Sequence, residues 1–525
     1  MPIFKTLLGL TAASVALALL ARRLGVPSAV TLVLGGMALA FVPGLPEVEL
    51  EPELALALFL PPLLQASALR TDWPAFRESL PFILLLAVGA VLVTAGAVAA
   101  AVKPLAPELP WAAAVALGAI VAPPDAVSAT SVMKGFRLPK RIVTVLEGES
   151  LINDASALVL YRFAVTATMA GSISLAQASA SFLLNAAGGG AIGLAVGWAT
   201  VWFLVRLNDR MLEIIVSFLS AFASYFAAEA VHVSGVLAAV ACGGVVGRRR
   251  LELAAGTRLE GSTAWEFVEF VLTSLVFMLM GLQLRGMLER LTDTDPWRLG
   301  LLAAAASAAL IVSRIVWVFA TFYPAAALAS DLNGKGFIPP RSYPTIISWA
   351  GMRGVVSLAA ALALPAEFPG RDEIVFVVFC CILVSLILQG TTLAPLIRRF
   401  DLTDPEIEAV RPEVATARKE IAVAAVSALS ERLEDEEHGQ VAETLVQDFQ
   451  GRVEHAERLN EDAKAAQQRM NAQLQLRLSA LTAARAKLTE MRDQLDGDTL
   501  STLVQELDLE EEQIRVALRS AKPDV

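Results

Sequence analysis

Cysteine and histidine are scarce in this chain of 525 residues, which contains three of each. The cysteines, Cys242, Cys380 and Cys381, all lie in apolar segments, where a free thiol packs as a small hydrophobic group. Their placement argues against a disulfide framework and against a thiolate metal site. The sequence also lacks a glycine-rich phosphate-binding loop, so we expect no ATP hydrolysis. We therefore expect no enzymatic activity, no cofactor and no nucleic-acid partner.

Charge is sparse in the first 400 residues, whereas hydrophobic residues make up 56% of the chain and the mean hydropathy is +0.60. Apolar stretches recur at lengths near the roughly 20 residues that a helix needs to span a bilayer. This pattern predicts an all-α polytopic membrane protein. We count thirteen candidate spans, at 3–21, 27–45, 52–69, 80–102, 110–133, 142–169, 179–205, 211–231, 234–247, 265–284, 299–328, 343–365 and 373–397.

Lysine and arginine are distributed unevenly between the loops. Alternate loops carry 16 of them and the opposite set carries 6. Because basic residues favour the cytoplasmic side, the N-terminus is predicted to lie outside and the C-terminal tail inside. The six basic residues predicted outside are Lys5, Lys103, Arg285, Arg290, Arg298 and Arg371.

The tail, residues 401–525, differs in composition from the rest of the chain. It carries 27 acidic and 15 basic residues, a net of −12 against −10 for the whole chain, so residues 1–400 are near +2. Its pattern is helical rather than alternating, which predicts a cytoplasmic helical or coiled-coil regulatory tail. Its ligand is unknown. His438 and His455 either make the tail respond to pH or are ordinary surface side chains.

The stretch "EGESLINDASALVLYRF", residues 147–163, places carboxylates inside an apolar run. In one helix, Glu149 lies above Asn153 and Ser150 above Asp154, since residues four apart share a face. A charge near the centre of a span is costly and normally faces a cavity or a partner. Asp154 is therefore the main candidate for a functional carboxylate. The alternative is a structural group that holds helices together.

A second interruption lies in "GAIVAPPDAVSATSVMKGF". Pro123 and Pro124 cannot donate backbone hydrogen bonds and disfavour a helix interior. The helix should open there, and non-helical backbone is tolerated at membrane depth where it lines a cavity. Asp125 follows directly. It either lines that cavity or caps the second half-helix, and the two roles are compatible.

A third interruption lies in "SWAGMRGVVSLAAALALP", where two glycines flank Arg353. An interrupted span in each half of the chain indicates an inverted-repeat transporter with its site near the membrane midplane. Arg353 needs an anion, and we expect Glu149 first and Asp125 second. Arg314, in "ALIVSRIVWVF", is the rival partner for Glu149.

Together these motifs resemble those of the sodium/proton exchangers, the electroneutral, bacterial-type branch of the monovalent cation/proton antiporters. "EGESLINDASALVLY" matches the family's "GES-L-ND" pattern, and "GMRGVVSLAAALALP" resembles its "GLRGA" stretch. "PPDAVSAT" resembles its "DPVAV" core with proline and aspartate in a different order. The resemblance covers residues 1–400. It implies thirteen helices with inverted repeats and broken helices, forming a homodimer in the lipid bilayer of a bacterial inner membrane.

The resemblance also implies roles for single residues. Asp154 binds the cation and the proton in turn, with Asn153 and Ser150 beside it. Glu149 forms a structural salt bridge with an arginine, for which Arg353 is the first choice and Arg314 the second.

Oxygen ligands suit a hard alkali cation. We expect them from Asp154, Ser150 and a backbone carbonyl near Pro124, with Asp125 in the same candidate site. One carboxylate beside a neutral asparagine predicts electroneutral one-for-one exchange by alternating access. Na⁺ is the first candidate cation, and Li⁺ and K⁺ remain open. The alternatives are a K⁺/H⁺ antiporter and a tail-regulated cation channel or sensor on the same fold.

Overall fold

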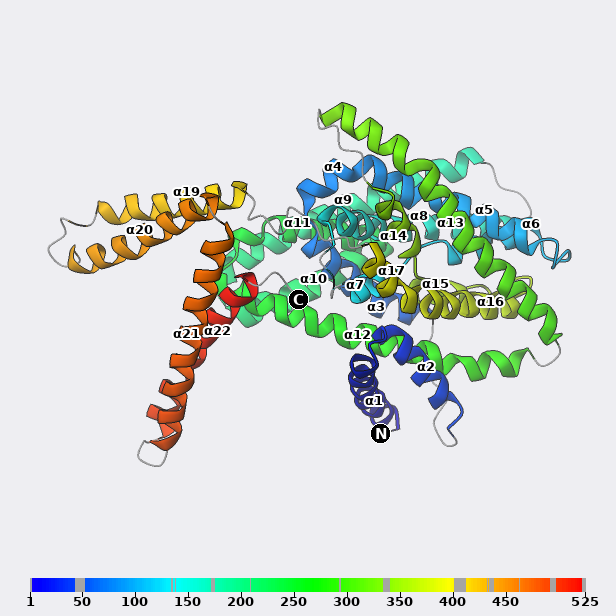
Figure 1. Ribbon diagram of the computed structural model, residues 1–525. Helices are drawn as coiled ribbons and strands as arrows, with labels where there is room; N and C mark the ends of the chain where they lie inside the picture. Colours follow the sequence, from blue (N-terminus) through cyan, green and yellow to red (C-terminus); the bar gives the residue numbers. More distant parts are fainter. Residues whose placement is uncertain are drawn as a thin grey trace. The chain divides into compact units, whose positions relative to one another are not determined.

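A computed structural model describes residues 2–42, 52–133, 136, 138–170, 175–207, 209–291, 294–333, 340–400, 412–431, 433, 439–461, 463–491 and 497–521. All elements within these ranges are helices, with no strand among them (Figure 1). The prediction of an all-α fold is therefore confirmed. The chain divides into two compact units, residues 1–134 with 140–401 and residues 135–139 with 402–525.

The first unit contains the apolar segments of the sequence, and each of the thirteen candidate spans falls on a helix or on consecutive helices. Its elements are α1 (Pro2–Leu24), α2 (Ser28–Ala40), α3 (Pro52–Arg70), α4 (Trp73–Leu84), η1 (Leu85–Ala90), α5 (Val91–Val102), α6 (Trp111–Val121), α7 (Ala126–Met133), α8 (Lys140–Ala170), α9 (Leu175–Leu207), α10 (Arg210–Ala230), α11 (Gly235–Arg248), η2 (Arg250–Glu252), α12 (Ala255–Arg290), α13 (Pro296–Asn333), α14 (Ser342–Trp349), α15 (Val355–Leu362), α16 (Arg371–Val384), η3 (Ser385–Gln389) and α17 (Gly390–Phe400).

Six helical stretches among the described residues are long and apolar enough to cross a membrane. The total of thirteen crossings stays a prediction. The six stretches are Trp73–Val102, Leu184–Leu207, Arg210–Ala230, Ala255–Arg290, Pro296–Pro324 and Arg371–Phe400.

The eighth and ninth candidate spans are two separate helices. Helix α10 ends at Ala230, and His232 takes a positive φ of 59°, which breaks the helical path. Ser234 then caps α11, because its side chain accepts a hydrogen bond from the backbone N–H of Leu237. A short local signal thus divides one long apolar stretch into two helices.

Small residues allow some of these helices to approach closely. Helix α12 packs against α2, where a methyl group on Gly36 or on Gly281 would collide with the backbone of the other helix. Small residues serve this purpose in membrane-type packing, where van der Waals contact replaces the hydrophobic driving force between helices. Helix α12 also packs against α1 and α3, and more lightly against α15 and α16.

The second unit consists of paired helices, α19 (Pro412–Ser430) with α20 (Gly439–Glu461) and α21 (Ala463–Glu490) with α22 (Gly497–Ala521). Leu474 and Leu481 of α21 pack with Ile514 of α22 in a small apolar core. His455 lies half-buried on α20, whereas His438 lies outside the described residues. The regulatory role of this unit stays a prediction.

Candidate functional site

Two interrupted helices meet within the first unit. Helix α6 ends at Val121 and α7 begins at Ala126, so the proline pair does open the chain as predicted. The second break runs between α14 and α15. The two breaks touch, because the backbone N–H of Asp125 donates to the carbonyl of Met352 at 2.7 Å. Gly354 lies so close to the Asp125 carboxylate that a methyl group there would collide with it.

Arg353 joins the two breaks through backbone carbonyls. Its buried guanidinium donates from Nε to the carbonyl of Val121 at 2.6 Å, and from Nη1 to the carbonyl of Gly351 at 2.6 Å. Val121 is the last residue of α6, where carbonyls lack intrahelical partners and a positive charge complements the helix dipole. The backbone N–H of Arg353 donates to the hydroxyl of Ser385 at 3.0 Å.

Glu149 pairs with Arg314 of α13, and the expectation that it pairs first with Arg353 is corrected. The guanidinium of Arg314 donates to both carboxylate oxygens of Glu149, at 2.5 and 2.8 Å. The two side chains are only 2% and 1% exposed. Arg314 also donates to the carbonyl of Ile347 in α14 at 3.2 Å. Arg353 is instead satisfied by carbonyls that the helix breaks set free, so it does not require Glu149.

Asp154 lies on α8 with 6% of its surface exposed and lines a small cavity. No described residue forms an ion pair or a hydrogen bond with its carboxylate. The cavity has a volume of about 10 Å³, which is room for about one water-sized particle. Its other walls come from the end of α6, from Pro123, from α8 and from Val356 and Ala360 of α15.

Asn153, the residue before Asp154, is fully buried and holds the first break in place. Its Nδ2 donates to the carbonyl of Pro124 at 3.1 Å. Its Oδ1 is buried and has no hydrogen-bond donor among the described residues. Asn153 itself does not line the cavity of Asp154. Ser150 is half-buried one turn before Asp154 and does not line the cavity.

Asp125 is half-buried and does not line the cavity that Asp154 lines. Its carboxylate accepts a hydrogen bond from the hydroxyl of Ser128 at 2.5 Å. Ser128 lies in the first turn of α7, so Asp125 sits at the positive end of that half-helix. Capping is thus the role of Asp125 that its contacts favour.

Sequence reasoning missed Tyr161 and the supports of a π-helix. Tyr161 is buried and lines the cavity seven residues after Asp154, a helical spacing that would have placed it on the same face. Ser156 donates to the carbonyl of Ala87 at 2.5 Å, and Trp317 Nε1 donates to that of Leu85 at 3.0 Å. Both carbonyls belong to η1, a π-helical turn that nothing in the local sequence announces.

Among the described residues, no group of three or more histidine, cysteine or acidic side chains gathers as a metal site. The three cysteines are free thiols. The arrangement around Asp154 offers one buried carboxylate and a small cavity, with the polar side chain of Tyr161 in its wall. Such a site can take up one small cation or one proton.

The chain is similar to known proteins over most of its length. Residues 9–399 match the family described as "Sodium/hydrogen exchanger, transmembrane". An Escherichia coli protein named "Uncharacterized Na(+)/H(+) exchanger YjcE" is 33% identical over 497 residues, which cover 88% of this chain and 89% of the relative. A Bacillus pumilus protein named "Sodium, potassium, lithium and rubidium/H(+) antiporter" is 31% identical over 444 residues, which cover 81% of this chain and 65% of the relative.

A solved structure shares the fold. The sodium proton antiporter MjNhaP1 from Methanocaldococcus jannaschii matches with a TM-score of 0.59 over 76% of this chain and 99% of that chain. The sequence identity over the match is 16%, so this likeness concerns the fold alone.

Proposed function

Because the chain belongs to the sodium/hydrogen exchanger family, we propose that it exchanges a monovalent cation, Na⁺ first, for a proton at Asp154. The observation that carries the proposal is the buried carboxylate of Asp154, which lines a cavity and has no ion-pair partner among the described residues. A charge in such surroundings needs a counter-charge, and either a proton or an alkali cation supplies it. The two ions therefore compete for one group.

The neighbouring charges support a single exchanging carboxylate. Glu149 is committed to Arg314, and Asp125 is engaged by Ser128. Asn153 is neutral and adds no second charge, and its buried Oδ1 has no hydrogen-bond donor among the described residues. With one carboxylate, the site carries the same charge with a cation as with a proton. Exchange is then one-for-one and electroneutral, and alternating access moves the site between the two sides.

The remaining parts of the proposal concern the cell. We place the protein in a bacterial inner membrane as a homodimer, with the N-terminus outside and the tail in the cytoplasm. The 16 to 6 distribution of basic residues between the two sets of loops supports this orientation. The tail then regulates exchange from the cytoplasmic side, and its ligand stays open.

The test is proton movement in liposomes that contain the purified full-length protein and an internal pH dye. Gradients of Na⁺, Li⁺ and K⁺ are imposed in turn on the wild type and on Asp154→Asn. We expect cation-driven proton movement in the wild type and at least a roughly hundredfold loss in the variant, which cannot take up a proton or offer a charge to the cation.

Glu260→Gln is the matched control, because Glu260 is an exposed carboxylate that pairs with Arg210. It should exchange like the wild type. Proton movement that persists in Asp154→Asn would move the site to another carboxylate, with Asp125 next. Flux without a proton gradient would instead indicate a channel, and absence of flux with every cation would favour a sensor.

K⁺/H⁺ exchange is the second candidate function. The observation that favours it is the relative from Bacillus pumilus, whose name includes potassium, lithium and rubidium beside sodium. The same liposome series ranks these cations. A K⁺ response above the Na⁺ response would replace sodium as the principal substrate and leave the role of Asp154 unchanged.

A further inference from the structure

The cavity of Asp154 has a second polar side chain in its wall. Nine of the described residues line it, and among them only Asp154 and Tyr161 have polar side chains. The others are Pro123 and apolar residues of α6, α8 and α15. Ser150 and Asn153, which the sequence placed beside Asp154, do not line it. The side chains of this cavity therefore offer an occupant one carboxylate and one phenolic hydroxyl.

Tyr161 is directed along the cavity by its place on α8. It is buried, with 9% of its surface exposed, and lies two helical turns after Asp154. Side chains on a helix lean toward its N-terminus, so Tyr161 covers the turn before it, in the direction of Asp154. Ala157 and Leu158 lie in that turn and line the same cavity. The ring of Tyr161 thus follows the wall of the cavity toward the carboxylate.

The hydroxyl of Tyr161 has no hydrogen-bond partner among the described residues, although a buried tyrosine hydroxyl normally finds one. The carboxylate of Asp154 is in the same position. Both residues line one cavity of about 10 Å³, and buried polar groups of this kind are costly unless something satisfies them. One small cation would satisfy both, because it neutralises the carboxylate and accepts a lone pair from the hydroxyl oxygen.

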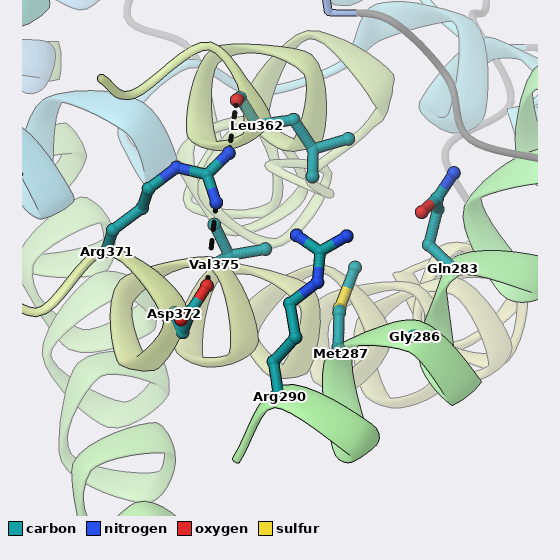
Figure 2. A pocket seen from close by; sticks show the side chains of 8 residues that line it. All are labelled: Gln283, Gly286, Met287, Arg290, Leu362, Arg371, Asp372 and Val375. Atoms are coloured by element: carbon teal, nitrogen blue, oxygen red, sulfur yellow. Dashed lines mark hydrogen bonds and ion pairs between the residues drawn. The ribbon is translucent and has the colours of Figure 1, made fainter. Parts of the chain in front are cut away.

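Another wall of the cavity is formed by Val356 and Ala360 of α15, and the end of this helix is held in place. Figure 2 shows Arg371 reaching from α16 to the carbonyl of Leu362, the last residue of α15, to which its Nη2 donates at 3.1 Å. Its Nε donates to the carbonyl of Leu364 at 2.9 Å. A wall held in this way keeps the cavity small, and cavity size together with ligand number sets the choice between hard cations.

We infer that Tyr161 determines the cation specificity of this site: its hydroxyl oxygen is a ligand of the cation that Asp154 binds. The inference rests on the proposed exchange function. The cavity has room for about one water-sized particle, so a cation sheds most of its hydration shell on entry, and the hydroxyl replaces part of it. Without their hydration shells, Na⁺ and Li⁺ are smaller than a water molecule, whereas K⁺ is about as large. The hydroxyl should therefore favour the two smaller cations.

The test is the cation dependence of exchange in liposomes by Tyr161→Phe, which keeps the ring and removes only the hydroxyl. The control is Tyr323→Phe, at a half-buried tyrosine of α13 that does not line the cavity. We expect the KM for Na⁺ to rise at least about fivefold in Tyr161→Phe, with the maximal rate nearly unchanged and the preference for Na⁺ over K⁺ reduced. Tyr323→Phe should match the wild type in all three respects.

A purely structural role of Tyr161 would give a different result. It would lower the maximal rate or the thermal unfolding temperature, and it would weaken all cations alike. An unchanged KM for Na⁺, a fall in the maximal rate alone, or an equal loss for Na⁺ and K⁺ would overturn the inference.

A binding measurement separates this inference from the exchange proposal. Na⁺, exchanged for N-methylglucamine at constant ionic strength, should raise the thermal unfolding temperature of the full-length protein in a neutral detergent, because a ligand stabilises the state that it binds. Tyr161→Phe should need at least about fivefold more Na⁺ for the same rise, and Asp154→Asn should show none. A wild-type response in Tyr161→Phe beside a lost response in Asp154→Asn would overturn only the role of Tyr161. Exchange that persists in Asp154→Asn would overturn the exchange proposal.

Discussion

The two interrupted helices carry opposite charges where they touch. The first break places Asp125 beside the start of α7 and against Gly354, which directly precedes α15. The second break places Arg353 against the last carbonyl of α6. Since helix starts are positive and helix ends negative, each charge complements the half-helices around it. Asp154 lies outside both breaks, on the unbroken helix α8.

Each break is also held by a polar side chain from a neighbouring helix, and the two supports differ in the residue that follows them. In the first half, Asn153 of α8 donates to the carbonyl of Pro124. In the second half, Ser385 of η3 accepts from the backbone N–H of Arg353. Each half therefore fixes its own break with one polar side chain. Asn153 is followed by the carboxylate Asp154, whereas Ser385 is followed by the apolar Leu386. Two similar structural supports thus stand beside residues of different chemistry.

Breaking the buried ion pair between Glu149 of α8 and Arg314 of α13 should have the largest effect on stability. Arg314→Gln leaves Glu149 as an unpaired buried charge, and such a loss costs about 3–5 kcal/mol. We expect a large fall in the thermal unfolding temperature in detergent, or loss of folded protein. The double variant Glu149→Gln with Arg314→Gln should recover most of it. A double variant no better than Arg314→Gln would contradict the pairing.

Removing the charge of Arg353, at the second break, should have a smaller effect on stability. Arg353→Gln loses the charged donors to Val121 and Gly351 and leaves at least one buried carbonyl without a partner. We expect a loss of about 2 kcal/mol, measured by the same thermal unfolding. Arg353→Lys should restore part of it, because the ammonium group keeps the charge and one donor. A neutral effect of Arg353→Gln would mean that the carbonyls do not depend on this side chain.

Removing the charge of Asp125, at the first break, should reduce stability less still. In Asp125→Asn, the amide oxygen still accepts from Ser128, and only the charge at the helix ends is lost, which is about 0.5 kcal/mol. Exchange in liposomes should persist at a rate within a fewfold of the wild type. Abolished exchange in a folded variant would show that Asp125 titrates in the transport cycle and would rule out a single exchanging carboxylate.

A substitution in the tail should have the smallest effect on stability, in contrast to the substitutions at the two interrupted helices. Partial burial first, and then the charges of Arg418 and Arg458, lower the pKa of His455 below its usual 6.5. The unfolded chain then binds the proton more readily, so the α19–α20 pair should lose stability as the pH falls through about 6.5 and be insensitive above it. Hydrogen exchange of α20 in the full-length protein should show this, and His455→Gln should remove the dependence.

Local sequence was sufficient for the helices and for both breaks. The proline pair and the two glycines marked the interruptions because their effect on the backbone is local. The spacing of four residues likewise placed Glu149 with Asn153, and Ser150 with Asp154, on shared faces of α8. These features depend on short stretches of chain and need no knowledge of how the helices pack.

Partners across space were harder to predict. Glu149 had two candidate arginines, and the order chosen was wrong because a charge beside a helix break finds free carbonyls there. Arg314 lies in an unbroken helix, where the backbone carbonyls are mostly taken, so it is the arginine that needs an acid. The π-helical turns η1 and η3 escaped prediction because their supports, such as Trp317, come from distant helices.

The hydrogen bond between Asp125 and Met352 has a consequence for how this sequence can vary. Both partners are peptide groups, so almost any side chain at either position leaves the bond available. Proline at position 125 is the exception, since it has no N–H to donate. The order "PPD" keeps the prolines just ahead of that donor. This hydrogen bond therefore tolerates most substitutions at positions 125 and 352, with proline at position 125 as the exception.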